Sequence, residues 1–245
     1  MTGSGGNRLP DGWTCHSFDE LGSTMDAARD MAEGGAPDRT VVRAGRQTGG
    51  RGRQGRPWTS ESGNLYLTAI LREMRPLSDC AQLSFAAALA IGDTVDHPGT
   101  RFKWPNDVLI DGKKIAGILL EGGGSPATDG WVLIGIGLNV AHHPEETIFP
   151  ATDLAAEGRA QPLDALFRRV LEGIDHWRAI WHKDGASALH NAWMDRAHGL
   201  GQTIRARTGK SEMTGRFDGL DGDGALLIRG DDGITHRITA ADVFF

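Results

Sequence analysis

The order of the apolar segments constrains the fold of this 245-residue chain more than any other feature. Short runs with strand-like alternation follow one another with little more than turn residues between them, and helical patterns are inserted between some of them. Strands are expected at 13–18, 40–44, 64–71, 102–110, 115–121 and 131–139. Asp111-Gly112 joins the fourth and fifth of these strands as a hairpin signal. Because the strands mostly succeed one another directly, the pattern predicts an α+β fold rather than βαβ repetition.

Helices are expected at 25–33, 76–95, 163–181 and 186–196. The third is the clearest, because its apolar residues keep the i, i+3, i+4, i+7 spacing of an amphipathic helix. Ser23 and Thr24 precede the first helix as a capping-type start. Two polar stretches, 47–60 and 142–162, are predicted to be loops.

The composition changes at 199–201, where the sequence reads Gly-Leu-Gly. Beyond this point, Gly and Asp separate short β-rich pieces at 203–206, 212–218, 225–229 and 234–238. Their spacing predicts a small all-β module, SH3-like in size. The chain is therefore predicted to divide into a larger domain at 1–198, whose residues 1–12 form a loose tail, and a β domain at 199–245.

Charge and composition exclude several classes of protein. The net charge of −6 argues against a nucleic-acid coat protein. Cys15 and Cys80 stand alone, so neither a disulfide scaffold nor a cysteine metal site is predicted. The N-terminus lacks the apolar core of a signal peptide, and the most apolar stretch, 85–91, is too short to cross a bilayer. The chain is predicted to be cytoplasmic, with no membrane partner.

Residues 43–60, which we call the arginine loop, carry five arginines and no acidic residue. Mutual repulsion makes such a loop hard to order alone, and a bound anion would order it. Its glycines supply bare backbone N–H groups, and its arginines supply forked donors for phosphate or carboxylate. Trp58 offers a flat face on which a base could stack. The loop therefore predicts an anion site next to an aromatic platform.

Three other interpretations of the arginine loop are open. Residues 50–55 fit the G-x-G-x-x-G dinucleotide fingerprint, but that fingerprint needs a helix at its third glycine, and here a strand follows. An Arg-Gly loop can also bind RNA, although the acidic remainder of the chain disfavours this function. The loop could also be solvated and without function.

A second polar group interrupts the strand expected at 102–110. Lys103 lies eleven residues before Lys114, on two strands that a hairpin joins, so the two lysines can approach one another. Pro105 demands a sheet edge or a break, and Asn106 and Asp107 at that break can direct polar side chains at a ligand. Taken alone, each lysine is a surface residue. Taken together with the arginine loop, they favour a site for a nucleotide and a carboxylic acid.

Asn139 follows the apolar run at 131–138. Its amide can cap a turn or hydrogen-bond a purine edge, and the sequence leaves both roles open. Gly117 leaves room for close approach of a backbone or a ligand.

Six motifs, taken in their order along the chain, resemble those of biotin protein ligases, the family that biotinylates acetyl-CoA carboxylase and its relatives. The motifs are Ser23-Thr24, Gln47, GGRGRQGRPW (49–58), KWPNDVL (103–109), GKKIAGILLE (112–121) and GIGLNV (135–140). The resemblance implies a class II synthetase-like mixed sheet packed against helices, with a small C-terminal SH3-like barrel. Some family members also carry an N-terminal DNA-binding domain. Only residues 1–12 precede the first expected strand, so the chain resembles the form without that domain.

The resemblance also implies ligand-contacting residues. For biotin it implies Ser23, Thr24, Met25, Gln47, Arg51, Gly52, Arg53 and Lys114, with Met25 standing where the family usually has Asn. For ATP it implies Arg53, Arg56, Trp58, Lys103, Asn106 and Asn139. Lys114, Arg53 and Asp107 are the candidate catalytic residues, and no residue is expected to be a dedicated metal ligand. Asp107 would act as a base or orienting group, and its alternative role is to end the strand by a turn.

The implied reaction attaches biotin to one lysine of a biotin carboxyl carrier domain, in acetyl-CoA carboxylase or a related carboxylase. It would use ATP and Mg²⁺ and pass through biotinyl-5′-AMP. Some family members pair through the central sheet, which would make a homodimer. The main alternative is a lipoate-type protein ligase, which activates a different acid, and the other is an RNA-binding module that uses the arginine loop.

Overall fold

The computed structural model describes residues 9–125, 127–145, 147, 149–209 and 211–245, so most of the tail expected at 1–12 lies outside the described residues. A seven-stranded sheet forms the larger part, in the order β1-β2-β3-β7-β6-β5-β4. Its strands are β1 (Thr14–Leu21), β2 (Thr40–Gln47), β3 (Leu65–Arg72), β4 (Thr100–Lys103), β5 (Asp107–Ile110), β6 (Lys113–Gly123) and β7 (Trp131–Leu138). β1 and β2 are parallel and every other neighbouring pair is antiparallel, so the mixed sheet is confirmed.

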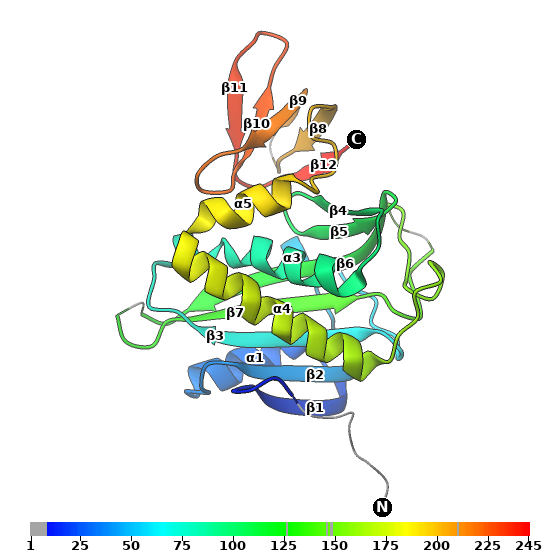
Figure 1. The fold of residues 1–245 in the computed structure, drawn as a ribbon, viewed down its shortest axis with the longest axis vertical. Helices are drawn as coiled ribbons and strands as arrows, with labels where there is room; N and C mark the ends of the chain where they lie inside the picture. Colours follow the sequence, from blue (N-terminus) through cyan, green and yellow to red (C-terminus); the bar gives the residue numbers. More distant parts are fainter. Residues whose placement is uncertain (1–8, 126, 146, 148, 210) are drawn as a thin grey trace, which may run out of the picture.

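Helices cover both faces of this sheet (Figure 1). α1 (Thr24–Glu33) packs against β2, β3 and β7 on one face. The other face carries α2 (Leu77–Cys80), α3 (Leu83–Val95), α4 (Leu163–Asp184) and α5 (Ala186–Met194). α3 is apolar all round because it lies between the sheet and α4, whereas the amphipathic α4 buries only one face.

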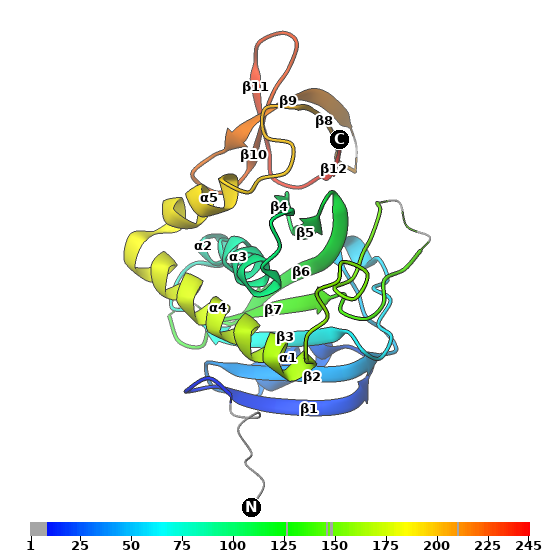
Figure 2. The ribbon, with the colours of Figure 1, turned by 45° about the vertical axis from the view of Figure 1, so that its right-hand side comes forward.

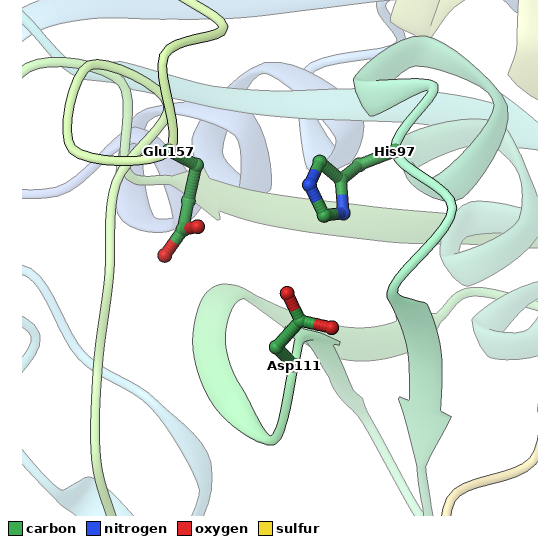
Figure 3. Close-up of side chains that lie close together, drawn as sticks. All are labelled: His97, Asp111 and Glu157. Atoms are coloured by element: carbon green, nitrogen blue, oxygen red, sulfur yellow. The ribbon is translucent and has the colours of Figure 1, made fainter.

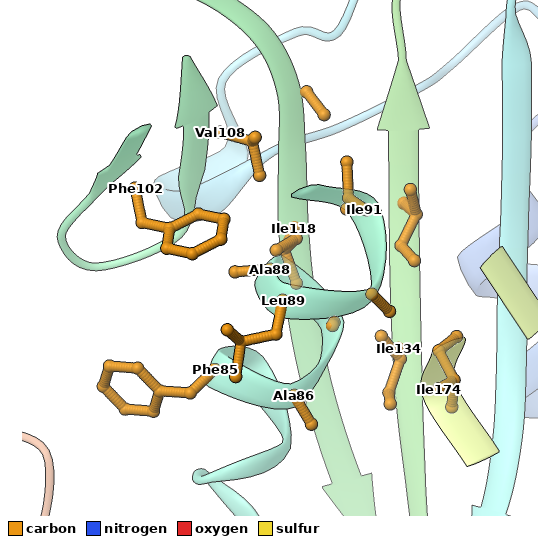
Figure 4. Packing of buried hydrophobic residues seen from close by; sticks show 14 of the residues in the cluster. Phe85, Ala86, Ala88, Leu89, Ile91, Phe102, Val108, Ile118, Ile134 and Ile174 are labelled. Atoms are coloured by element: carbon orange, nitrogen blue, oxygen red, sulfur yellow. The ribbon is translucent and has the colours of Figure 1, made fainter. Parts of the chain in front are cut away.

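Successive side chains along the central strands point to opposite faces of the sheet, so the sheet has a buried core on each face. Val42 and Ile70 pack with α1, and their neighbours Val41 and Leu71 belong to the larger core on the side of α3 and α4. Figure 4 shows Leu89 and Ile91 of α3 packed among Ile118 of β6, Ile134 of β7 and Ile174 of α4. Each such buried side chain contributes about 1.5–3 kcal/mol relative to exposure. This packing fixes the strand ends that carry the polar residues described below.

The expected strand 102–110 is wrong. The chain turns at 104–106, so β4 and β5 are two antiparallel strands in which Lys103 is paired with Asp107. Pro105 cannot donate a ladder hydrogen bond, which ends β4 and permits the turn. Lys103 and Lys114 therefore do not lie on neighbouring strands, because β5 separates β4 from β6. The single helix expected at 76–95 is likewise two helices, α2 and α3.

A second, antiparallel sheet follows, in the order β11-β10-β9-β8-β12. Its strands are β8 (Thr203–Arg207), β9 (Glu212–Leu220), β10 (Leu226–Arg229), β11 (Thr235–Ile238) and β12 (Asp242–Phe244). The small C-terminal β module is thereby confirmed, with the addition of β12, which the sequence did not predict. Figures 1 and 2 place it beyond α5, at the β4 end of the first sheet. Among the described helices, none is both long and apolar enough to cross a membrane.

Candidate active site

A cavity of about 450 Å³ lies where the two sheets meet the arginine loop, a volume usual for small-molecule sites. Its walls come from the start of α1, the arginine loop, the turn between β4 and β5, strands β6 and β7, and β12. Four residues of the connection that follows β7 complete them: Pro144, Thr147, Phe149 and Ala151. Every residue that the sequence singled out lines this one cavity: Ser23, Thr24, Met25, Gln47, Arg51, Gly52, Arg53, Arg56, Trp58, Lys103, Asn106, Asp107, Lys114 and Asn139. The fold therefore brings the separate motifs together, while their individual roles stay predictions.

The start of α1 is fixed by hydrogen bonds to Gln47. Ser23 caps the helix by accepting from the Met25 backbone N–H at 3.3 Å. The Gln47 amide oxygen accepts from the Thr24 backbone N–H at 2.8 Å and from its hydroxyl at 3.1 Å. The Gln47 amide nitrogen donates to the Ser60 hydroxyl at 3.0 Å. These bonds hold the end of β2, the helix start and the end of the arginine loop in one arrangement.

Met25 fills space rather than offering a polar group. Its side chain is buried, and a Cβ placed on Gly135 of β7 would lie 2.6 Å from the Met25 sulfur. The thioether therefore packs directly over the backbone of β7. At the position where the resembling family usually has Asn, this wall of the cavity is apolar.

Acidic side chains from other elements neutralise most of the arginine loop. Four of its five arginines form ion pairs: Arg43 with Asp164 at 2.6 Å, Arg46 with Glu20 at 2.7 Å, Arg51 with Asp26 at 2.7 Å and Glu121 at 3.3 Å, and Arg56 with Asp242 at 2.5 Å. Arg43 and Arg46 belong to β2, so beyond the strand Arg51 and Arg56 are paired and Arg53 is not, and the expectation that a bound anion orders the loop stays a prediction. The loop has no acid of its own, and the folded chain supplies the acids.

Arg53 differs from the other four, because it forms no ion pair with any residue that the structure describes. It is partly buried, and burial lowers the pKa of its guanidinium, while Asp242 and Asp107 oppose this effect. An arginine keeps its proton even so. Arg53 therefore brings to the wall of the cavity a positive charge without an ion-pair partner among the described residues.

Two lysines and one aspartate face each other across the β4–β6 edge. The Lys114 ammonium lies 2.6 Å from a carboxylate oxygen of Asp107. Lys103 is only 6% exposed, and its ammonium lies 3.3 Å from the centre of the Phe149 ring. Burial lowers the pKa of Lys103 to about 8, although the nearby Asp107 carboxylate opposes this effect. A buried lysine with so little compensation favours an incoming anion.

Trp58 lies across a pair of glycines. Gly117 of β6 and Gly137 of β7 are paired, and a Cβ on either would lie 2.8 Å or less from the indole. The indole nitrogen is buried and has no hydrogen-bond partner among the described residues. The Lys114 ammonium lies 5.1 Å from the ring centre. The two glycines thus leave a slot on the sheet, which the Trp58 indole fills.

Asn106 and Asn139 use their side-chain amides on the protein itself. Asn106 donates to the Ile118 carbonyl at 2.7 Å, which anchors the β4–β5 turn on β6. Asn139 is buried and donates to the Thr152 carbonyl at 3.0 Å. No residue that the structure describes donates a hydrogen bond to either amide oxygen. The Asn139 bond ties the end of β7 to a residue 13 positions further along the chain, so the two roles that the sequence left open for Asn139 both stay predictions.

Asp242 and Phe149 are among the lining residues that the sequence did not single out. Asp242 comes from β12 and pairs with Arg56, a contact between residues 186 positions apart. Phe149 comes from the 142–162 connection and covers Lys103. An isolated aromatic residue in a polar stretch was the only signal for Phe149, and no local pattern marked Asp242.

His97, Asp111 and Glu157 form a second polar group outside the cavity (Figure 3). Their potential ligand atoms lie within 4.8 Å of one another. However, the Gly99 backbone N–H donates to His97 Nδ1 at 3.0 Å, so Nε2 carries the proton of the neutral ring. Glu157 already accepts from the Thr152 hydroxyl at 2.6 Å. We assign these contacts to the bracing of three surface turns.

Two family models match the chain. The biotin/lipoate A/B protein ligase family matches residues 18–139, which include every cavity residue singled out from the sequence. The biotin protein ligase C terminal domain matches residues 199–245, which form the second sheet.

Relatives and solved structures agree with these matches. A biotin–[acetyl-CoA-carboxylase] ligase of Paracoccus denitrificans is 41% identical over 215 residues, covering 83% of this chain and 89% of the relative. The biotin protein ligase of Aquifex aeolicus in complex with biotin and ATP superposes with a TM-score of 0.79 at 26% identity, covering 94% of this chain and 98% of the other. The biotin protein ligase of Leishmania major in complex with biotinyl-5-AMP gives 0.66 at 26% identity, covering 95% and 100%. By this identity over most of both chains, the chain belongs to the biotin protein ligase family.

Proposed function

We propose that this chain attaches biotin to a lysine of a biotin carboxyl carrier domain in two steps, through biotinyl-5′-AMP. The single observation that carries the proposal is the cavity, which joins Arg53, the Lys114–Asp107 pair and the slot that Trp58 fills. Family membership supports biotin as the acid and ATP as the activating nucleotide. Acetyl-CoA carboxylase or a related carboxylase supplies the acceptor domain.

The first step must bring two anions together. A biotin carboxylate oxygen attacks the α-phosphorus of ATP, the bond from that phosphorus to the bridging oxygen breaks, and pyrophosphate leaves. We assign Lys114 to the α-phosphate and the biotin carboxylate, and Arg53, Arg56 and Lys103 to the phosphates. Trp58 and the amide oxygens of Asn106 and Asn139 would hold the nucleoside. Such catalysis rests on positioning and charge stabilisation.

The start of α1 and the arginine loop would hold biotin. We assign the polar end of biotin to Ser23, Thr24 and Gln47, whose hydrogen bonds fix them in place. Met25 would contact the acid through its thioether rather than by a hydrogen bond. Arg51 and Gly52, on the loop, would cover the bound acid and keep water from the mixed anhydride.

In the second step, the acceptor lysine attacks the acyl carbon and AMP leaves. A free lysine has a pKa of about 10.4, so its amine must lose a proton first. Asp107 is our candidate base or orienting group, because its carboxylate is held by Lys114 at 2.6 Å and faces the cavity. Once pyrophosphate has left, the Asp107 carboxylate would lie near the incoming amine.

Magnesium fits the site only as part of the ATP substrate. The two carboxylates that line the cavity, Asp107 and Asp242, each lie against a cation, Lys114 and Arg56. Mg²⁺ prefers phosphate oxygens and water with few protein carboxylates, so ATP would supply its ligands. The ion would reduce the charge of the triphosphate when it is bound.

The pKa of Lys103 predicts a pH dependence for ATP use. Lys103 binds phosphate only when protonated, and its pKa in the folded protein is about 8 instead of 10.5. We expect kcat/KM for ATP to fall as the pH rises through about 8, because kcat/KM reports the free enzyme. Between about pH 8 and pH 10.5 Lys103 binds more protons in the unfolded chain than in the folded protein. Its contribution to the free energy of unfolding therefore rises with pH, so unfolding does not explain the loss of activity. A Lys103→Arg variant that folds should lack this fall; a flat profile in the unaltered protein contradicts the role.

The glycine slot predicts a steric effect. A methyl group at position 137 would lie 2.4 Å from the Trp58 indole nitrogen, so Gly137→Ala should push the ring out of its place. Displacement of a positioning group by about 1 Å can cost 10²-fold in rate, and we expect a loss of that size in pyrophosphate release. Gly222→Ala is the matched control, since no atom lies within 4 Å of its added methyl. Equal rates in the two variants would contradict the slot.

Two rival functions are weaker. A lipoate-type ligase would share the fold and the adenylation chemistry, but the similar proteins reported above are biotin ligases. An RNA-binding module needs free arginines, whereas four of the five in the loop are paired with acids of the same chain. We also propose domain boundaries at 1–198 and 199–245. A homodimer and a cytoplasmic location stay predictions.

Biotin transfer is tested with a purified carrier domain. The protein, biotin, MgATP and the domain are incubated, and the mass of the domain is measured. We expect one added biotin per domain, and none when its acceptor lysine is replaced by arginine. An unchanged mass of the unaltered domain would contradict the transfer step.

A further inference from the structure

Asp242 lies at the boundary between the two sheets. It begins β12, where Ala241 and Val243 on either side of it are buried, so the backbone at this point is held by packing. Its carboxylate is 18% exposed and lines the cavity. Arg56 of the arginine loop lies 2.5 Å from it, and Arg207 of the neighbouring strand β8 lies 4.0 Å away. The C-terminal sheet therefore places one carboxylate against the loop.

The side-chain hydrogen bonds of Arg56 to described residues all use one nitrogen. Its Nη2 donates to Asp242 at 2.6 Å and 2.5 Å and to the Gln54 side chain at 2.9 Å. Neither Nε nor Nη1 donates to any residue that the structure describes. The guanidinium is a planar, rigid fork, so a carboxylate that holds one nitrogen also sets the direction of the others.

Neither the backbone before Arg56 nor the exposure of its side chain fixes the direction of the guanidinium. Gln54 and Gly55 both have positive φ, 57° and 70°, so the loop turns sharply just before Arg56. Arg56 itself is 44% exposed, and an exposed arginine samples many rotamers. Without Asp242, the side chain would be free to leave the cavity wall.

We propose that Asp242 is a positioning residue for ATP, which holds Arg56 so that its Nε and Nη1 donors meet the triphosphate. The inference rests on the proposed adenylation and gives the C-terminal sheet a part in it. Asp242 does not touch the reacting atoms and acts through Arg56.

The test compares two aspartates of the same sheet. Asp242→Asn keeps the size of the side chain and removes its charge. Asp218→Asn is the matched control, because Asp218 is also 18% exposed and also faces two arginines, Arg216 and Arg229, but does not line the cavity. Pyrophosphate release is measured against ATP concentration at saturating biotin, and against biotin concentration at saturating ATP.

For Asp242→Asn we expect the KM for ATP to rise about tenfold, the scale of a hydrogen bond to a charged group, with the KM for biotin unchanged. Asp218→Asn should leave both unchanged. Asp242→Glu retains the carboxylate and should restore part of the affinity, which also covers the case in which the Asn variant does not fold. In an Arg56→Ala background, Asp242→Asn should have no further effect.

Three outcomes would overturn the inference. The first is an unchanged KM for ATP in Asp242→Asn. The second is a lower KM for ATP, which would mean that Asp242 competes with the triphosphate for Arg56. The third is a rise in the KM for ATP that is equally large when Asp242→Asn is made in the Arg56→Ala background. Absence of biotin-dependent pyrophosphate release from the unaltered protein would instead contradict the proposed function. The two failures are therefore distinct.

Discussion

Lys114→Ala is expected to lower biotin-dependent pyrophosphate release about 10³-fold, the loss seen when one essential charge-stabilising donor is removed from an active site. Lys114 lines the cavity between Trp58 and Asp107, with its ammonium 2.6 Å from the carboxylate. Alanine would remove the cation and leave the negative Asp107 to repel both the biotin carboxylate and the phosphate. The first step should therefore fail even at saturating substrate. Initial rates of pyrophosphate release measure this directly.

Lys113→Ala is the matched control for this variant. Lys113 is the preceding residue of β6, its side chain is 50% exposed, and it pairs with Glu157 rather than with a cavity residue. A surface pair of this kind contributes little to stability, so the variant should fold and keep its rate. A Lys114→Ala rate within about tenfold of the control would contradict the assigned role, since one donor in such a site is worth more.

Arg53→Gly is expected to release the activated acid from the enzyme. Arg53 is the one loop arginine without an ion pair among the described residues, so a bound phosphate or carboxylate would be its main partner. A hydrogen bond to a charged group contributes about 1.5–3 kcal/mol, so biotinyl-5′-AMP should dissociate at least about tenfold faster. The escaped anhydride would then acylate lysines of bystander proteins. Streptavidin blots of an added protein such as serum albumin detect this labelling.

Arg46→Gly tests whether the effect depends on the position within the loop. Arg46 has an exposed side chain, pairs with Glu20 and does not line the cavity. Both substitutions replace one arginine of residues 43–60 by glycine, Arg46 near the end of β2 and Arg53 beyond that strand. Stray labelling by Arg53→Gly alone agrees with retention of biotinyl-5′-AMP by Arg53. Equal labelling by both variants, or by neither, would count against it.

The cavity could be predicted from the sequence because most of its walls come from short contiguous motifs. Gly117 and Gly137 are separate in the sequence, but both belong to strands whose apolar patterns are unambiguous. Once those strands pair, the motifs on their ends must lie close together. The resemblance to biotin protein ligases then assigned the motifs to ligands.

The interpretation failed where distant residues decide the structure. Arginines of the arginine loop pair with acids such as Asp26 and Asp242, which no local pattern connects to the loop. β12 is three residues long, too short to show any periodicity, and it forms only because β8 offers an edge. The sequence predicts one strand where β4, a turn and β5 are found, because apolar residues continue on both sides of Pro105. In each case tertiary pairing overrides the local signal.

Pyrophosphate release from MgATP, measured in parallel with biotin and with lipoate, tests the central claim most directly. The account predicts release that depends on biotin, with no release above background in the presence of lipoate. Release with lipoate alone would contradict the assignment of the acid while leaving the adenylation chemistry in place. Release with neither acid would contradict the account, because Arg53, Lys103 and Lys114 would then line a cavity with a different purpose.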